Sequence, residues 1–326
     1  MMTAPLITVI MPAYNSVQYI EKAIKSVLNQ TYSQLELLII DDGSNDGTRE
    51  IINQQQQSDD RIRLICLDNQ GSGAARNEGL RRATGEYVAF IDADDYYDQD
   101  FLLQGMRLAE QGCDCIVYNY QRFNSDQETL YRVEPTPLKS YSAVWNKLYR
   151  KECWDNLSFP QNMKIEDFEV VPIAVGSAKK IGFVSDTFYY YRIHQISITH
   201  QTDINEAREA VKACQLLFEN MKKKAVSFNQ DDLALYINSF LYSHLYTCMS
   251  RLSTKDEKKA AFNIITTYSK ALNKQVFNSA KTLVAPSKSK QLRNDLMTTL
   301  FNAGYFNLGL LLVNSMAKLF GKRGVK

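Results

Sequence analysis

Short apolar runs alternate with amphipathic segments over the first hundred residues. Four runs rich in apolar and β-branched residues predict buried strands, at residues 6–11, 35–40, 61–67 and 87–91. Apolar side chains recur at helical spacing between these runs, over residues 17–29, 48–56 and 74–83. We expect the first strand to stop at Pro12, because proline cannot donate a ladder hydrogen bond. The alternation predicts an α/β fold with a mostly parallel sheet and helices on both faces.

The pattern changes along the rest of the chain. The pattern predicts helices over residues 101–110, 145–154 and 166–176. It predicts strands over residues 113–118 and 180–192, and a loop over the polar residues 121–140. From about residue 202 the spacing is helical throughout, over residues 203–224, 231–252, 255–274 and 288–301. We therefore predict an α/β domain over residues 1–200 and a helical domain over residues 201–326.

The composition is that of a folded protein. Of the 326 residues, 45% are hydrophobic and 23% are charged, which excludes a disordered or fibrous chain. The six cysteines are scattered, with no CxxC pair and no zinc-ligand spacing, so we expect reduced thiols and a cytoplasmic protein. Neither a signal peptide nor a transmembrane helix is expected, because the chain has no basic leader and no apolar stretch of about 18 residues.

The charge is unevenly distributed. The net charge is +2, but residues 281–326 contain eight basic residues and one acidic residue, Asp295, so this tail carries +7 and the rest of the chain −5. Residues 305–320 within the tail are mostly apolar. An apolar segment with basic flanks favours peripheral contact with an anionic membrane over nucleic acid. A core helix or a contact between subunits remains the alternative.

Polar clusters follow three of the four predicted strands. Tyr14 and Asn15 follow the first strand, Asp41 and Asp42 end the second, and residues 92–95 follow the fourth. The carboxyl ends of parallel strands meet at one edge of a sheet, where ligands of open α/β folds bind. We therefore expect the functional site at this edge.

The acidic cluster suits a metal ion. Asp92 and Asp94 follow an apolar strand, and carboxylates beside a diphosphate suit Mg²⁺ or Mn²⁺, which take their remaining ligands from phosphate and water. The alternative is an acidic loop that caps the next helix near Asp98 or Asp100. Residues 41–48 also resemble a calcium loop, but Asn53 stands at the twelfth position and a strand precedes, so calcium is rejected.

A glycine-rich turn enters the third helix at residues 69–77. It lacks the GxGxxG pattern because Arg76 stands at the third glycine position, and no phosphate-binding P-loop motif occurs, which disfavours a dinucleotide dehydrogenase. Arg76 could pair with a phosphate or a base carbonyl. Asp41 could accept from a nucleobase N–H. The alternatives are a capping loop on a surface helix and a turn with a helix cap.

Together these motifs resemble the family 2 nucleotide-sugar glycosyltransferases of GT-A fold. The resemblance lies in the order and spacing of PAYN (12–15), DDGS (41–44), NxG…ARN (69–77) and DAD (92–94), and covers about the first 110 residues. It extends to NKLY (146–149), to the Glu166-Asp167 pair, and to YRxH (191–194) with SIT (197–199). The later motifs are similar to the bacterial capsule, exopolysaccharide and wall-polymer subgroup.

The resemblance implies a role for each matched residue. The implied nucleotide-binding residues are Pro12, Ala13, Tyr14, Asn15, Asp41, Gly71, Arg76, Asp92 and Ala93, with Asp41 on the base. The implied metal ligands are Asp94, Asp92 and His194, with Asp94 the more direct. Asp167 matches the catalytic base and Glu166 its partner, while Arg192 and Lys147 match contacts to the diphosphate or the acceptor.

The implied activity is inverting transfer of a hexosyl or N-acetylhexosaminyl group, with Mn²⁺ or Mg²⁺ as cofactor. The donor is expected to be a UDP-sugar and the acceptor a hydroxyl of a lipid-linked saccharide or other cell-surface glycan precursor. The C-terminal helices could contact acceptor, membrane or another subunit. One alternative is a nucleotidyltransferase, which the first loop disfavours. Another is a catalytically silent glycan-binding or scaffold subunit, against which the intact aspartates argue.

Overall fold

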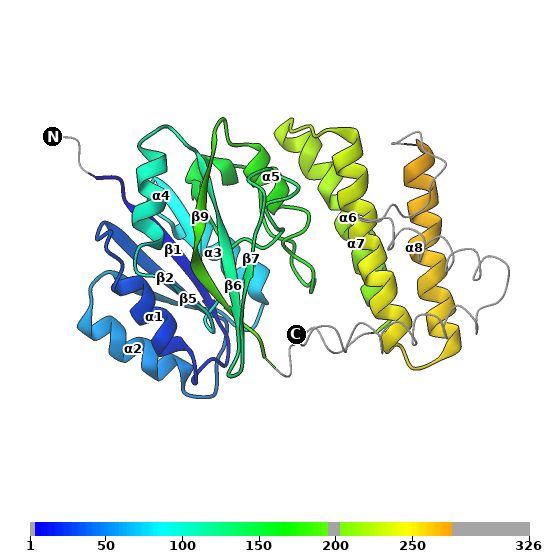
Figure 1. Ribbon diagram of the computed structural model, residues 1–326. Helices are drawn as coiled ribbons and strands as arrows, with labels where there is room; N and C mark the ends of the chain where they lie inside the picture. The colour runs from blue at the N-terminus through cyan, green and yellow to red at the C-terminus, as the bar shows by residue number, and fades with distance from the viewer. Residues whose placement is uncertain (1–3, 195–202, 276–326) are drawn as a thin grey trace. The chain divides into compact units, whose positions relative to one another are not determined.

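The computed structural model describes residues 4–194 and 203–275 (Figure 1). The chain divides into two compact units, one of Met1–Ser197 with Leu217–Val226 and one of Ile198–Leu216 with Ser227–Lys326. The predicted helix 288–301, the apolar segment 305–320 and the motif 197–199 lie outside the described residues. Each unit is considered by itself.

One mixed sheet organises the first unit, with strand order β3-β2-β1-β4-β8-β6-β9-β5 and β7 paired to β6. The strands are β1 Ile7–Ala13, β2 Leu35–Asp41, β3 Ile62–Cys66, β4 Tyr87–Phe90, β5 Tyr96–Tyr97, β6 Cys115–Phe123, β7 Glu128–Tyr131, β8 Lys147–Arg150 and β9 Ile181–Arg192. The first four strands in this order pair in parallel, as do β6 and β9. The predicted α/β class is confirmed.

Helices cover both faces of the sheet (Figure 1). They are α1 Ile20–Leu28, α2 Thr48–Ser58, α3 Ser72–Arg82, α4 Phe101–Ala109 and α5 Val171–Gly176. Val9 and Met11 of β1 lie in one core with buried side chains of α1, α2 and α4. The opposite face of β1 carries Ile10, against which Gly79 of α3 packs. Alternation along the strand thus gives each face its own helices.

The first strand continues through Pro12 to Ala13, so its predicted end was wrong. Pro12 pairs with Ile40 of β2, whereas the ladder with β4 ends at Ile10 and Phe90. Proline is accepted there because the strand has only one ladder neighbour beyond that point.

Three later predictions were also wrong. The predicted helix 145–154 is strand β8 followed by a short 3₁₀ helix, Lys151–Trp154, because β8 pairs antiparallel with β4 and β6. The predicted loop 121–140 contains the end of β6 and strand β7, which form a hairpin. The predicted helix 166–176 begins only at Val171, so Glu166 and Asp167 precede it on a turn.

The second unit is helical in its described part. It contains the beginning of α6 (Asn205–Lys224) and the whole of α7 (Gln230–Arg251) and α8 (Lys255–Gln275), close to the predicted ranges. The Asn273 amide bonds Asn238 and Ser269, which joins α7 to α8 through buried polar groups. Within residues 4–194 and 203–275, no helix is both long and apolar enough to cross a membrane. All six cysteines are free thiols.

Candidate active site

The loops after β1 and β2 are tied together at the carboxyl edge of the sheet. The parallel register places Ala13 beside Asp41. Asn15 has a left-handed backbone (φ 47°), its N–H donates to Ser44 Oγ over 2.9 Å, and its Oδ1 accepts from Asn45 N–H over 2.9 Å. Tyr14 is 45% exposed beside this junction, whereas Ala13 is buried. The two loops leave an exposed ring at the predicted nucleotide edge.

Asp41 and Asp42 are adjacent, but their carboxylates have different partners. Asp41 accepts from Arg49 Nε over 2.6 Å and from Ser44 N–H over 3.1 Å. Asp42 accepts from the N–H groups of Gln70 and Gly71, each over 2.7 Å. Successive side chains leave a strand on opposite sides, so Asp41 binds its own loop and Arg49 of α2, while Asp42 holds the glycine-rich turn.

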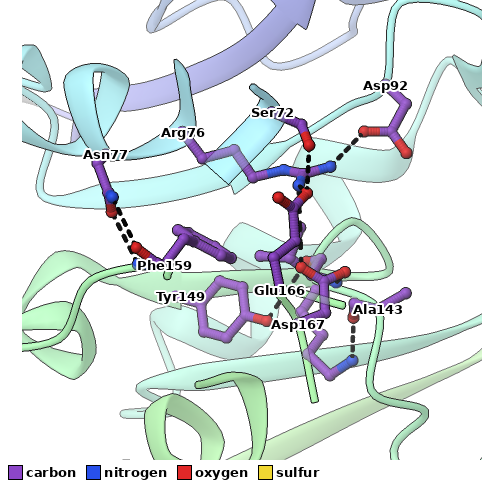
Figure 2. Close-up of polar contacts among 11 residues, drawn as sticks. Ser72, Arg76, Asn77, Asp92, Ala143, Tyr149, Phe159, Glu166 and Asp167 are labelled. Atoms are coloured by element: carbon purple, nitrogen blue, oxygen red, sulfur yellow. Dashed lines mark hydrogen bonds and ion pairs between the residues drawn. The ribbon is translucent and has the colours of Figure 1, made fainter. Parts of the chain in front are cut away.

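Arg76 of α3 is the centre of the site (Figure 2). Its buried guanidinium donates from Nη2 to Asp92 Oδ1 over 2.9 Å and from Nη1 to Glu166 Oε1. Nη1 also lies 3.9 Å from Asp167 Oδ1. One arginine therefore joins the end of β4 to the acidic pair, whose Glu166 lies 90 residues beyond Arg76 in the chain.

Close packing between α3 and residues 159–166 makes these contacts possible. Asn77 exchanges two hydrogen bonds with the Phe159 backbone, of 2.9 and 2.8 Å (Figure 2). A Cβ at Gly73 would lie 2.6 Å from the Pro160 carbonyl oxygen and 3.0 Å from Glu166 Oε2. Only glycine permits this approach. Ser72 Oγ then donates to Glu166 Oε1 over 2.6 Å.

Asp167 is hydrogen-bonded at one oxygen, and its other oxygen is buried without a hydrogen bond among the described residues. Its Oδ2 accepts from the Val144 N–H over 3.2 Å, while Oδ1 makes no hydrogen bond to any residue in the described part of the chain. Burial, together with the Glu166 and Asp92 charges, raises the pKa of Asp167 to about 7 against the opposing charge of Arg76. A carboxylate with this pKa can accept a proton near neutral pH.

Lys147 has a different role from the one implied by the resemblance. Its buried ammonium donates to the carbonyl oxygens of Tyr141 and Ala143, each over 2.8 Å, and to Asn146 Oδ1 over 2.7 Å. Because these three bonds use all its N–H groups, Lys147 holds residues 141–146 and does not face a diphosphate. Burial lowers the pKa of Lys147 to about 7.

Among residues 92–95, the carboxylates of Asp92 and Asp94 are partly exposed and that of Asp95 is buried. Asp92 pairs with Arg76, and the buried Asp95 accepts from Tyr189 OH and the Arg192 N–H, each over 2.7 Å. The Asp94 side chain is 34% exposed, and its Oδ2 lies 2.6 Å from His194 Nε2. Arg192 Nε donates to the Asp94 carbonyl over 2.9 Å, which brings the end of β9 onto this turn.

The donor atoms around Asp94 fit Mg²⁺ or Mn²⁺ bound together with a diphosphate. No cluster of three or more potential metal-ligating side chains occurs within residues 4–194 and 203–275. These ions are commonly held by only one or two protein groups when phosphate supplies the rest. Asp94 with His194 meets that requirement, and Asp92 is occupied by Arg76.

The predicted residues thus form three connected groups. The first group consists of Arg76, Asp92, Glu166 and Asp167. The second group consists of Asp94, His194 and Arg192. The third consists of the loops that carry Pro12, Tyr14, Asn15, Asp41 and Gly71, linked by the contacts of Asp42. Ala93 is buried between Asp92 and Asp94.

Several residues at the site were given no role of their own in the sequence analysis. They are Asp42, Arg49, Ser72, Asp95, Val144 and Tyr189. Asp42 and Asp95 stand inside the predicted polar clusters, each directly after another aspartate. These adjacent aspartates are a sequence signal by which both residues could be found. The pairing of Tyr189 with Asp95 spans 94 residues and has no local signature.

The fold and these strand-end carboxylates define a glycosyltransferase of GT-A type. Residues 8–179, just over half of the chain, match the model of glycosyl transferase family 2, and the chain belongs to this family. It is 29% identical to EpsH of Bacillus subtilis, named as a glycosyltransferase, over 76% of this chain and 77% of EpsH. It is 44% identical over 111 residues to TuaG of B. subtilis, named as a teichuronic acid biosynthesis glycosyltransferase, covering 33% and 44% of the two chains.

A solved structure has the same fold. The structure of S. aureus TarS 1-349 in complex with UDP-GlcNAc matches with a TM-score of 0.75 and 20% identity, covering 96% of this chain and 92% of that one. The family and the GT-A architecture implied by the sequence motifs are therefore confirmed.

Proposed function

We propose that this glycosyltransferase moves a sugar from a UDP-sugar to a hydroxyl of a cell-surface polysaccharide or its lipid-linked precursor, with inversion at the anomeric carbon. The observation that carries the proposal is the state of Asp167, whose Oδ1 has no hydrogen-bond donor among the described residues and whose pKa is raised to about 7 by burial. The UDP-GlcNAc bound to TarS supports a UDP-sugar donor, and the name of TuaG supports a surface polymer.

Donor binding would use the edge of the sheet. The base would lie by the loops of Tyr14 and Asp41, where the Tyr14 ring is exposed and the buried Asp41 carboxylate holds the second loop. The diphosphate would lie toward Asp94, His194 and Arg192. Asp94 and His194 would hold Mn²⁺ or Mg²⁺, which when bound neutralises charge on the leaving diphosphate.

Asp167 would act as the base. Glu166 and Asp92 each accept a hydrogen bond from Arg76. Asp167 accepts none from it, and its Oδ1 lies 3.9 Å from Arg76 Nη1. It would take the proton as the acceptor oxygen attacks the anomeric carbon from the side opposite the diphosphate. Proton removal of this kind contributes about 10²–10⁴-fold to a rate. Glu166, held by Ser72 and Arg76, would orient the pair.

The proposed donor and acceptor also suggest where in the cell the enzyme would act. A nucleotide-sugar donor and free cysteines suit the cytoplasm, and a lipid-linked acceptor would bring the enzyme to the membrane surface. The basic tail would supply that contact, or the C-terminal helices would contact acceptor or a second subunit.

Donor hydrolysis with stereochemical analysis tests the proposal. The protein is incubated with α-linked UDP-sugars and Mn²⁺, and ¹H NMR follows the anomer first released. Inverting transfer to water releases the β-anomer, and Asp167→Asn removes this activity. Release of the α-anomer would contradict inversion, and release only from GDP-sugars would replace the donor.

A further inference from the structure

An aromatic surface borders the site on one face of β6 and β9. It consists of Tyr120, Tyr131, Tyr141, Trp145 and Tyr191, and we call it the aromatic platform. The Tyr120 ring stacks on Tyr131 and on Tyr141, with centroids 5.1 Å apart in both pairs. Tyr120 is buried, but Tyr131 is 36% and Tyr141 39% exposed. The platform therefore presents two outer rings to solvent.

Arg122 lies among these rings without a counterion. Its guanidinium carbon is 4.5 Å from the Tyr131 centroid and 5.5 Å from that of Tyr191, and Nη2 donates to Tyr141 OH over 3.3 Å. No carboxylate forms an ion pair with Arg122 in the described part of the chain, and its buried Nε has no hydrogen-bond acceptor there. Aromatic faces offset part of the cost of a half-buried cation, and an anionic ligand would offset the rest.

The platform is continuous with the catalytic groups. Arg122 is the register partner of Tyr191, so both lie on the sheet face on which β9 also carries Tyr189. Trp145 stacks on Tyr189, with centroids 4.2 Å apart, and Tyr189 OH bonds Asp95. A ligand on these rings would therefore lie beside the strand ends that carry Asp92 and Asp94.

The same loop connects the platform to the proposed base. Tyr141 and Trp145 flank Val144, whose N–H donates to Asp167 Oδ2. Tyr141 has a backbone φ of +65°, a conformation that costs a bulky residue free energy and that persists mainly where the surroundings impose it. The Lys147 ammonium donates to the Tyr141 carbonyl, and the Arg122 guanidinium donates to the Tyr141 hydroxyl. Strain of this kind, on an exposed ring next to a base, is typical of a ligand-binding position.

We propose that Arg122, Tyr131 and Tyr141 form an acceptor subsite for a saccharide chain that carries an anionic group, either a phosphate or a carboxylate. The exposed rings would cover the apolar face of a sugar unit, and the guanidinium would form charge-assisted hydrogen bonds to the anion. The inference rests on the proposed function, because it names the acceptor class of that same site. It predicts a preference that the transfer chemistry alone does not require.

Direct binding measurements on the full-length protein, saturated with UDP and Mn²⁺, test this subsite. Three probes are compared by calorimetry: a glycerol phosphate oligomer, a glucuronate-containing disaccharide, and neutral chitobiose. We expect at least one anionic probe to bind about tenfold or more tightly than chitobiose. A phosphate preference and a carboxylate preference both support the subsite and identify the anion. Weaker or equal binding of both anionic probes overturns it.

Variants then assign the binding to these residues. Arg122→Gln and Tyr141→Ala should each weaken the anionic probe about tenfold, whereas Arg63→Gln, an exposed arginine on β3 paired with Glu36, should leave it unchanged. Unchanged affinity in Arg122→Gln overturns the proposal. If that variant does not fold, Arg122→Lys, which keeps the charge without the planar fork, must still weaken binding. UDP affinity, measured alone, reports on the donor site, so its absence counts against the proposed function and not against the subsite.

Discussion

The Val144 N–H donates to Oδ2 of Asp167 over 3.2 Å and leaves Oδ1 of the same carboxylate without a hydrogen bond among the described residues. The loop that carries Val144 is held in turn by the Lys147 ammonium. A base must be fixed in direction and yet have a free lone pair for the proton that it removes. The Val144 contact fixes the carboxylate in direction, and the buried Oδ1 keeps its lone pairs free of hydrogen-bond donors among the described residues.

Asp167→Asn is expected to lower the rate of transfer or donor hydrolysis by 10²-fold or more, because the amide cannot accept the proton. The Val144 contact can be kept by the amide oxygen, so UDP affinity should stay within about twofold. Steady-state rates and calorimetric UDP binding measure the two effects. Activity within about tenfold of the wild type would show that Asp167 is not the base.

The pH dependence should report the same carboxylate. Burial raises the pKa of Asp167 to about 7, so the rate should rise with pH through about 7 and level off above it.

The contribution of Asp167 to the free energy of unfolding should change with pH in the opposite direction. The folded state binds the proton more tightly than the unfolded state, whose pKa is near the ordinary 3.8, so this group lowers the free energy of unfolding as pH rises from about 4 to 7. The stability of Asp167→Asn relative to wild type should therefore increase over that window, as measured by urea unfolding. A flat difference would contradict the raised pKa.

Asp94→Ala is expected to abolish transfer and to weaken UDP binding mainly when Mn²⁺ or Mg²⁺ is present. The reason is that Asp94 is partly exposed, contacts His194 and, unlike Asp92, is not paired with Arg76. Asp98→Ala, further along the same chain segment, is the matched control. Calorimetry with and without EDTA separates the metal-dependent part, and equal wild-type activity in EDTA and Mn²⁺ would remove the metal from the mechanism.

Arg76→Met should destabilise the fold by about 3–5 kcal/mol, because it leaves buried carboxylates without their cation. It should also move the rise in rate to higher pH, since the Arg76 charge lowers the pKa of Asp167. Arg82→Met on the same helix, where the side chain is exposed and pairs with Glu78, should change stability by less than about 0.5 kcal/mol. Thermal unfolding and rate–pH profiles measure both effects. Equal behaviour of the two variants would contradict the central role of Arg76.

The tail beyond Lys281 is expected to bind anionic membranes. Its +7 charge and apolar residues 305–320 supply two attachment signals, worth about 1 kcal/mol per basic residue near the surface plus apolar burial. The full-length protein should co-sediment with anionic liposomes at low salt and be released as salt rises. A chain ending near Ala280 should stay in the supernatant. Insolubility of that shorter chain, or a stable dimer that ignores liposomes, would instead assign the tail to a core or a subunit interface.

Much of the first hundred residues could be predicted because their signals are local. The apolar runs of β1 and β2 form a buried parallel pair, and such strands are hydrophobic on both faces. The acidic residues after β2 and β4 stand where strand ends must meet. The prediction for the later segment at residues 145–154 was wrong because β8 is a strand only through its pairing with β4 and β6. Its four residues carry no periodicity of sufficient length.

The sequence by itself determined the family, the central parallel strands and the residue types at the site, since these depend on short-range patterns and on motif spacing. Only the tertiary structure decided which of those groups meet. Arg76 is bound to Glu166 because Gly73 lets two distant segments approach, and the Lys147 ammonium is directed into its own loop. The raised pKa of Asp167 is likewise a property of its surroundings. Burial and the field of neighbouring charges depend on distances through space, which residue order along the chain does not specify.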